Sequence, residues 1–440
     1  MPRYFLRRAA LALAFILPAS SFAQTAPGDS SGTVKQRIAR ARELGKRDSG
    51  ALADLAPYLR DPERDVRLEA IKAVVRIDTR ASLDALVAAT HDRDPEIRIR
   101  ATDGIVNTYL PGYVANNSLS GNFTRGFRQI RDFFASRNDQ VVDADVVIRP
   151  DAAQALADQI NDGVSFDARS NAALAAGILR ARPAVPALTK GLRSKENDMI
   201  FECLVALQKI EDPAAGPAVG FLARDFDDRI QITALETIGR LRSLDSAPDV
   251  RYALKGGRNL KIRRAAMETL AMLGIPGDRA TFQQYADSGD AEMRAAALEG
   301  LGRIREPEDF RALKAAYDEP NADWRVHLAA AFALANQGKV DTEQFSPLPY
   351  LVESLNTKGR ATVASAYLKE LARHEDARAS LVKLLPDATK DQKLELCSVF
   401  AASRSDELLP ALNKLSKDAD PDVAFAASKA IRILQARGTS

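Results

Sequence analysis

The stretch DPERDVRLEA at positions 61–70 returns, slightly altered, as DRDPEIRIRA at positions 92–101. In the first copy, Val66-Arg67 opens a pattern with small or apolar residues at positions 70, 71 and 74. This spacing predicts an amphipathic helix, because residues three, four and seven positions apart share one helix face. A sequence motif that recurs after 31 residues also predicts a structural repeat.

The same frame continues along almost the whole chain. The residues equivalent to Arg67 are Arg98, Arg169, Ile200, Gln231, Arg263, Arg294, Arg325, Arg360, Lys393 and Ala424. Successive steps are 31 to 35 residues, except for one step of 71 that holds one period and an insertion of about 40 residues. Eleven occurrences in this register predict an array of units that pack only on their neighbours and extend in one direction.

Each unit reads as a helical hairpin, as in PAVPALTKGLRSKENDMIFECLVALQKI at positions 183–210. Acidic residues in the break between its helices are expected to cap the second helix, because a carboxylate accepts hydrogen bonds from free N–H groups. The residues predicted for this role are Asp61, Asp65, Asp94, Asp167 and Asp198. Prolines are expected at or near the start of the first helix, where a missing N–H costs nothing. They are Pro183, Pro213, Pro248, Pro307 and Pro410.

Residues 59–70 follow the pattern L-x-D-P-x-x-D-V-R-x-x-A, which resembles HEAT repeats of the short type found in phycobilin-lyase-like proteins. The resemblance covers roughly residues 50–107 and 150–435. It implies an all-α, right-handed α-solenoid of about eleven stacked hairpins, with the second helices lining the concave face. It implies little about function, because such repeats serve scaffolds, transport factors and a few enzymes.

The arginines of the frame permit two interpretations. They can form an anion-binding stripe, or they can pair with acids such as Asp65, Glu96 and Asp167 to bridge adjacent helix starts. Charged residues at hairpin turns usually cap helices or face solvent, so we favour the structural interpretation.

Residues 1–23 have the three parts of a secretory signal peptide: basic Arg3, Arg7 and Arg8, an apolar run, and the small-residue cleavage site Ser21-Phe22-Ala23. We therefore expect export to a periplasm or the cell exterior. A flexible stretch, 24–32, should precede a solenoid over 33–435. No later stretch is apolar enough to predict a transmembrane helix.

Removal of residues 1–23 leaves as many acidic as basic residues. A formally neutral chain argues against nucleic-acid binding, which requires a basic surface.

Cys203 and Cys397 lie six units apart, very roughly 50–60 Å at the usual helix spacing. A disulfide needs Cα atoms within about 7 Å, so both thiols should be free. Both cysteines should also be buried, and we expect the protein to be a monomer.

No familiar catalytic motif, cofactor loop or metal-ligand spacing occurs in the sequence. His91, His327 and His374 fall in three different units. We therefore predict no cofactor, no metal and no recognisable catalytic site. The favoured function is an exported scaffold that binds a protein or peptide. The alternatives are an envelope enzyme or chaperone-like assembly factor with an unrecognised site on the concave face, and a structural spacer.

The insertion, residues 108–148, differs from the repeats because it holds six aromatic residues in 41 positions, together with three glycines. Aromatic side chains in a loop on a rigid scaffold are typical of binding sites. The candidate partner-binding residues are Tyr109, Pro111, Tyr113, Phe123 and Phe127. The alternative is a hydrophobic plug, in which the same side chains pack against the solenoid.

Overall fold

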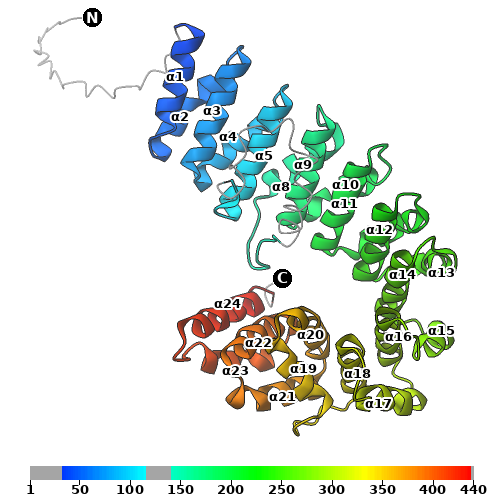
Figure 1. Cartoon of the computed structure of the whole chain (residues 1–440). Helices are drawn as coiled ribbons and strands as arrows, with labels where there is room; N and C mark the ends of the chain where they lie inside the picture. The colour runs from blue at the N-terminus through cyan, green and yellow to red at the C-terminus, as the bar shows by residue number, and fades with distance from the viewer. Residues whose placement is uncertain (1–31, 115–139, 438–440) are drawn as a thin grey trace, which may run out of the picture.

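The structure, a computed structural model, describes residues 32–114 and 140–437. Within these ranges the chain forms helices and turns, and no strand occurs. The helices alternate between an inner and an outer layer of a curved stack (Figure 1). The predicted α-solenoid is therefore confirmed. No helix of the described part has both the length and the apolar character needed to cross a bilayer.

The second helices of the hairpins form the inner layer, and the sequence frame locates them closely. They are α3 (Arg64–Ile77), α5 (Pro95–Tyr109), α9 (Phe166–Ile178), α11 (Asn197–Ile210), α12 (Asp228–Leu241), α14 (Leu260–Leu273), α16 (Ala291–Ile304), α18 (Trp324–Asn336), α20 (Lys358–Leu371), α22 (Lys390–Ser403) and α24 (Pro421–Arg437). In nine of these eleven described helices, the residue equivalent to Arg67 is the fourth residue.

The first helices are shorter and form the outer layer (Figure 1). They are α2 (Leu52–Leu59), α4 (Leu83–Ala89), α8 (Pro150–Asp162), α10 (Val185–Gly191), α13 (Ala247–Gly256), α15 (Arg279–Tyr285), α17 (Phe310–Asp318), α19 (Pro347–Glu353), α21 (Glu375–Leu384) and α23 (Leu409–Leu415). Before α12, two 3₁₀ helices, Pro213–Ala218 and Gly220–Arg224, replace the α-helix. Two prolines and two glycines in this stretch disfavour a regular α-helix. The five prolines lie where predicted, at or just before the first helices.

An additional helix, α1 (Val34–Leu44), packs against α3 before the first complete hairpin. Its fourth residue is Arg37, which pairs with Asp61 at 2.8 Å between Nε and Oδ2. Arg37 lies 30 residues before Arg67 and continues the same frame. The sequence analysis did not identify Arg37 as part of the frame. It looked for hairpins of two helices, and no first helix precedes α1 among the described residues.

Arg67 and Arg294, two of the fourth-position side chains, have the structural role favoured above. Arg67 donates from Nη1 to the Asp61 carbonyl oxygen at 2.9 Å and pairs with Asp92 of the next turn at 2.7 Å. Arg294 does the same with the Ala286 carbonyl oxygen and Glu319. Each side chain thus ties the end of its own first helix to the following unit. The expected partner of Arg67 was Asp65, but the partner is 25 residues further along.

The predicted caps are correct only in part. Asp94 caps α5 by accepting from Glu96 N and Ile97 N. Asp65, Asp167 and Asp198 lie instead inside the first turn of their helices. There a carboxylate still favours the positive end of the helix dipole. Arg229 reaches Asp198 from the next helix start, so some of these acids do bridge adjacent helix starts.

The array curves back on itself instead of extending in one direction, so that expectation is wrong. In Figure 1 the last helix, α24, lies near the segment that follows the insertion. Arg432 of α24 approaches Asp145 of that segment, with 3.8 Å between Nε and Oδ2. Small rotations between successive units add up to this curvature. The 31-residue period does not predict the size of these rotations.

The stack turns back on itself around α18 (Figure 1). Five alanines on α18 are buried, at positions 329, 330, 331, 333 and 335. Gly302 of α16 lies so close that an added Cβ would be 2.5 Å from Ala333. These small residues let α16 and α18 approach closely. Side chains of α16 and α20 then meet across the concave face, as Arg303 and Glu370 do at 3.0 Å.

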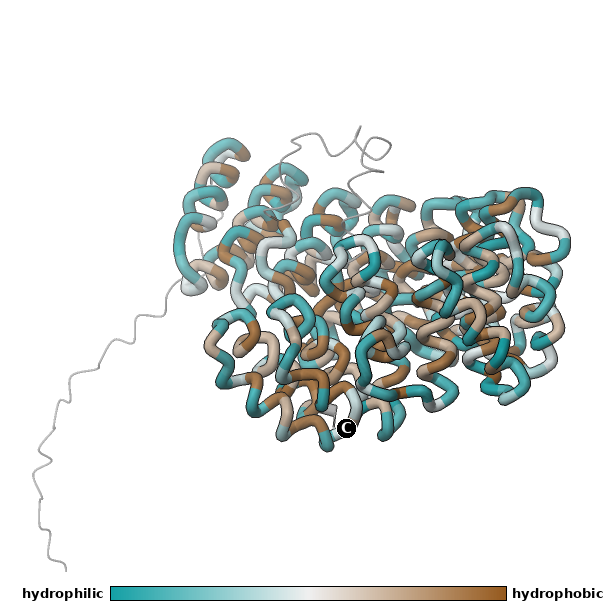
Figure 2. The backbone as a smooth tube through the Cα atoms, turned by 60° about the horizontal axis from the view of Figure 1, so that its bottom comes forward, coloured by the Kyte–Doolittle hydropathy of each residue, from teal (hydrophilic) through white to brown (hydrophobic). Residues whose placement is uncertain are grey.

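Buried apolar side chains form the core between the two helix layers. In Figure 2, hydrophobic and hydrophilic residues alternate along the helices, as expected when one face of each helix is buried. Cys203 and Cys397 are both free and buried in this core, which confirms that prediction.

Candidate functional site

The described ends of the insertion pack against the solenoid. Tyr109 accepts a hydrogen bond at its hydroxyl from Arg149 N, at 3.0 Å. Pro111 is exposed, and Gly112 turns the chain with a φ of 90°. Tyr113 is only 3% exposed, which favours the packing alternative for this residue. Phe123 and Phe127 lie outside the described residues, so their role in partner binding stays a prediction.

The segment that returns from the insertion crosses the ends of two second helices. Val142 is buried and donates from its N–H to the Ile178 carbonyl oxygen of α9, at 2.9 Å. Lys209 of α11 reaches the Gln140 carbonyl oxygen at 3.4 Å. This segment therefore lies on the solenoid itself, and it is the same segment that α24 approaches.

The concave face carries a row of carboxylates, here called the acidic row: Glu236, Glu268 and Glu299. Each is the ninth residue of its helix, on α12, α14 and α16. Because successive hairpins stack in register, equivalent positions lie side by side. In the described part of the chain, neither Glu236 nor Glu268 forms an ion pair within 4.0 Å.

Ionisation of Glu236 and Glu268 is unfavourable. Partial loss of hydration on the concave face, together with the carboxylates of Glu299 and Glu236, raises the pKa of Glu268 to about 7. Loss of hydration also raises the pKa of Glu236, opposed by Arg240 and Gln208. Both side chains are nevertheless exposed, which weakens the effect of lost hydration. A cationic group on the concave face could therefore pair with Glu236 and Glu268, which form no ion pair with other described residues.

A polar network around α18, where the stack turns back, closes one end of the row. Arg303 contacts both Glu299 and Glu370, at 2.9 and 3.0 Å. Burial alone would lower the pKa of Arg303, but these two carboxylates outweigh it and raise the pKa. The Tyr367 hydroxyl donates to Glu299, and its ring stacks on Phe332 with 4.6 Å between centroids. Glu299 is thus partly neutralised, whereas Glu236 and Glu268 are not.

Apolar side chains flank the acidic row. Met272 of α14 is partly exposed and lies over Gly239 of α12. Ile232 of α12 and Phe201 of α11 are half-buried at the other end of their helices. Surfaces that bind polypeptides commonly combine such apolar contacts with a few oriented charges.

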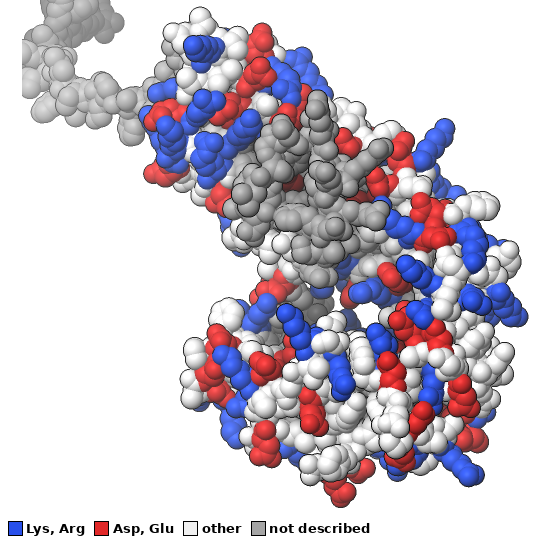
Figure 3. All heavy atoms as spheres, in the orientation of Figure 1, with Lys and Arg blue, Asp and Glu red and all other residues white. Residues whose placement is uncertain are grey.

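On the face shown in Figure 3, acidic and basic side chains are interspersed. The three histidines contribute no metal site, because the described residues contain no group of His, Cys, Asp and Glu able to hold a metal ion. His374, however, contacts Arg305 of another unit, a relationship that sequence analysis did not predict.

The acidic row was also missed in the sequence, although a signal for it exists. Glu236, Glu268 and Glu299 are separated by 32 and 31 residues, which matches the repeat frame. We followed only the fourth position of each second helix. The ninth position carries this second pattern, over three consecutive units.

Comparison with known proteins identifies the repeats. The family model for HEAT repeats matches residues 20–105 and 258–335. Both regions thus match the HEAT-repeat family, as the resemblance implied. No curated protein sequence is significantly similar to the chain.

Solved structures with a similar course of the chain are distant in sequence. One is the CpcE and CpcF complex of phycocyanin lyase from Nostoc sp. PCC7120, with 18% identity over 58% of this chain and 94% of the other, and a TM-score of 0.39. Another comes from a study of the interaction between cadherin and beta-catenin, with 14% identity over 94% and 98% and a TM-score of 0.42. Human deoxyhypusine hydroxylase has 19% identity over 57% and 96%, with a TM-score of 0.28.

Proposed function

We propose that this HEAT-repeat chain is an exported scaffold whose concave face binds a segment of another polypeptide that carries Lys or Arg. The acidic row is the observation that supports this function. Solenoids commonly bind partners on their extended concave surface. Two carboxylates of the row, Glu236 and Glu268, have raised pKa values, so their ionisation lowers the stability of the free protein, and a cationic partner would offset this penalty.

The N-terminal residues and the overall charge also bear on the function. The signal-like residues 1–23 support export, and N-terminal sequencing of the mature protein should begin at Gln24. The formally neutral mature chain supports a protein partner over nucleic acid. We expect the free protein to be monomeric.

Two exposed side chains provide a matched test of the binding face. Met272 is 37% exposed on the concave side of α14, and Tyr252 is 57% exposed on the outer helix α13. A photo-crosslinking amino acid at either position should leave the core intact. In envelope extract we expect a discrete adduct from position 272 and none from position 252. Adducts from position 252 alone would place binding on the convex face and contradict the proposal.

A further inference from the structure

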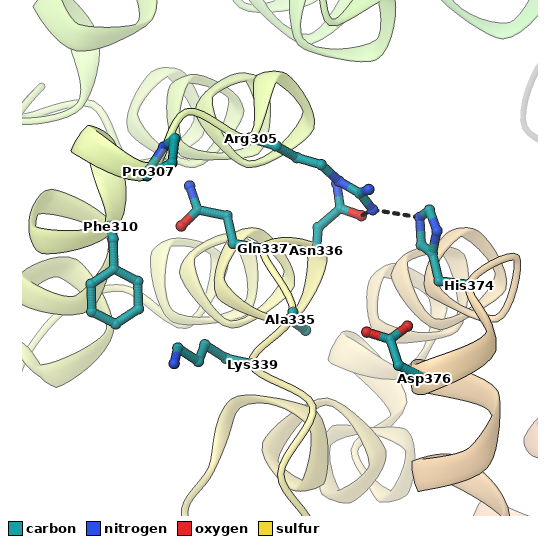
Figure 4. Close-up of a pocket in the computed structure, with 10 residues that line it drawn as sticks. Arg305, Pro307, Phe310, Ala335, Asn336, Gln337, Lys339, His374 and Asp376 are labelled. Carbon is teal, nitrogen blue, oxygen red and sulfur yellow. Dashed lines mark hydrogen bonds between the residues drawn. The ribbon is translucent and has the colours of Figure 1, made fainter.

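A cavity of about 600 Å³ lies at the rim of the solenoid, away from the acidic row. It opens where the ends of α16 and α18 meet the starts of α17 and α21 (Figure 4). Its size falls in the range of small-molecule sites, about 300–1,000 Å³. The side chains that matter for its chemistry are Arg305, Phe310, Lys339, His374 and Asp376.

Arg305 is held in place on one side of the cavity. Its Nη2 donates to Asn336 Oδ1 at 2.7 Å and to His374 Nε2 at 2.6 Å. A guanidinium can only donate, so Nε2 of His374 must accept and the imidazole must be neutral, with its proton on Nδ1. Burial and the charge of Arg305 accordingly lower the pKa of His374.

Cationic side chains outnumber carboxylates in the lining of the cavity. Lys339 forms no ion pair with any described residue, and its ammonium lies 5.4 Å from the centre of the Phe310 ring. His374 precedes α21, whose first N–H groups add partial positive charge. The only acid in the lining is Asp376, and its Oδ1 already accepts from Ala377 N.

The backbone at Arg305 has an unusual conformation. Its φ is +66°, in the left-handed region that favours glycine. Arg242 and Arg404 end their helices in the same way, so the conformation alone does not mark a site. Of these three arginines, Arg305 is the one that lines this cavity, and it contacts a histidine of another unit.

We infer that this rim cavity binds an oxyanion, a carboxylate or phosphate group, at Arg305 and His374, with an apolar part of the ligand against Phe310, where Lys339 adds positive charge (Figure 4). Arg and Lys are the side chains that most often bind such groups. This site is separate from the proposed concave binding surface and does not depend on it.

Histidine NMR tests the inference directly, because the chain has only three histidines. Inorganic phosphate and phenylacetate are titrated separately, at constant ionic strength set with chloride. Either probe should shift the His374 resonances saturably and leave those of His91 and His327 in place. Binding should also raise the pKa of His374, whose other charged neighbours are Asp376, Glu370 and Arg378. A response to phosphate alone or to phenylacetate alone assigns the type of oxyanion.

Glycine substitutions separate binding from folding. Arg305→Gly suits the φ of +66°, so the variant should fold, yet it should lose at least about ten-fold in affinity. Arg404→Gly makes the same change at a φ of 61° outside the cavity and should bind like the wild type. Lys339→Gln should also weaken binding. Absence of a saturable His374 shift with either probe, or an equal loss in Arg404→Gly, would overturn the inference.

Discussion

Lys429 of the last helix and Asp143, which precedes α8, form an ion pair with 2.7 Å between Nζ and Oδ1. They are 286 residues apart in the sequence, so the pair closes the curved solenoid. Both side chains are substantially exposed, at 37% and 47%. Exposed pairs of this kind contribute only about 0–1 kcal/mol, and salt weakens them.

The closed form should therefore open readily. We expect Lys429→Glu to increase the radius of gyration in small-angle scattering, while the helical circular dichroism stays unchanged. Lys314→Gln, which removes an exposed pair within α17, is the control and should leave the radius unchanged. A radius for Lys429→Glu equal to that of the wild type would show that this pair does not hold the two ends together.

The acidic row predicts a stability that depends on pH. The pKa of Glu268 is raised from 4.5 to about 7 in the folded protein, so its contribution to stability falls as the pH rises through that interval. Glu268→Gln should melt at a higher temperature than the wild type at pH 8 and at the same temperature near pH 4. Glu343→Gln, exposed at a turn, should show no such difference. If Glu268→Gln were less stable than the wild type at pH 8, the pKa of Glu268 would not be raised in the folded protein.

The fourth-position residues predict a contrast in stability. Arg67→Met leaves Asp92 and the Asp61 carbonyl buried without their partner, which should cost about 3–5 kcal/mol in urea unfolding. Arg64 pairs with Asp94 and Glu96 at an exposed position, so Arg64→Gln should cost at most about 1 kcal/mol. Equal losses would contradict a structural role specific to the fourth position.

The buried cysteines predict slow thiol chemistry. Burial raises the pKa of Cys203 and raises that of Cys397 to about 11, so both thiols stay protonated at neutral pH. A thiol reagent should react slowly with the native protein and should detect two thiols in unreduced protein unfolded in urea. Fast native labelling, or fewer than two thiols after unfolding, would refute this.

The sequence predicts features that repeat and misses those that depend on curvature. The 31-residue frame located the second helices, because each helix is determined by its own apolar pattern. It did not predict that Arg303 would meet Glu370, or Arg305 His374, in a unit that is not adjacent. These contacts arise from rotations between units, which involve no local pattern. The acidic row was readable in principle, since its spacing follows the repeat.

Binding of a basic peptide tests the central claim most directly. The affinity of a fluorescent peptide rich in Lys and Arg is measured by anisotropy at pH 8 for the wild type, for Glu236→Gln/Glu268→Gln, and for Asp245→Asn/Asp287→Asn. The last variant removes the same charge from exposed positions at the turns between helices. Our account predicts that only the acidic-row variant weakens binding, by about ten-fold if each lost contact contributes about 0.7 kcal/mol. Equal affinities for all three proteins would contradict it.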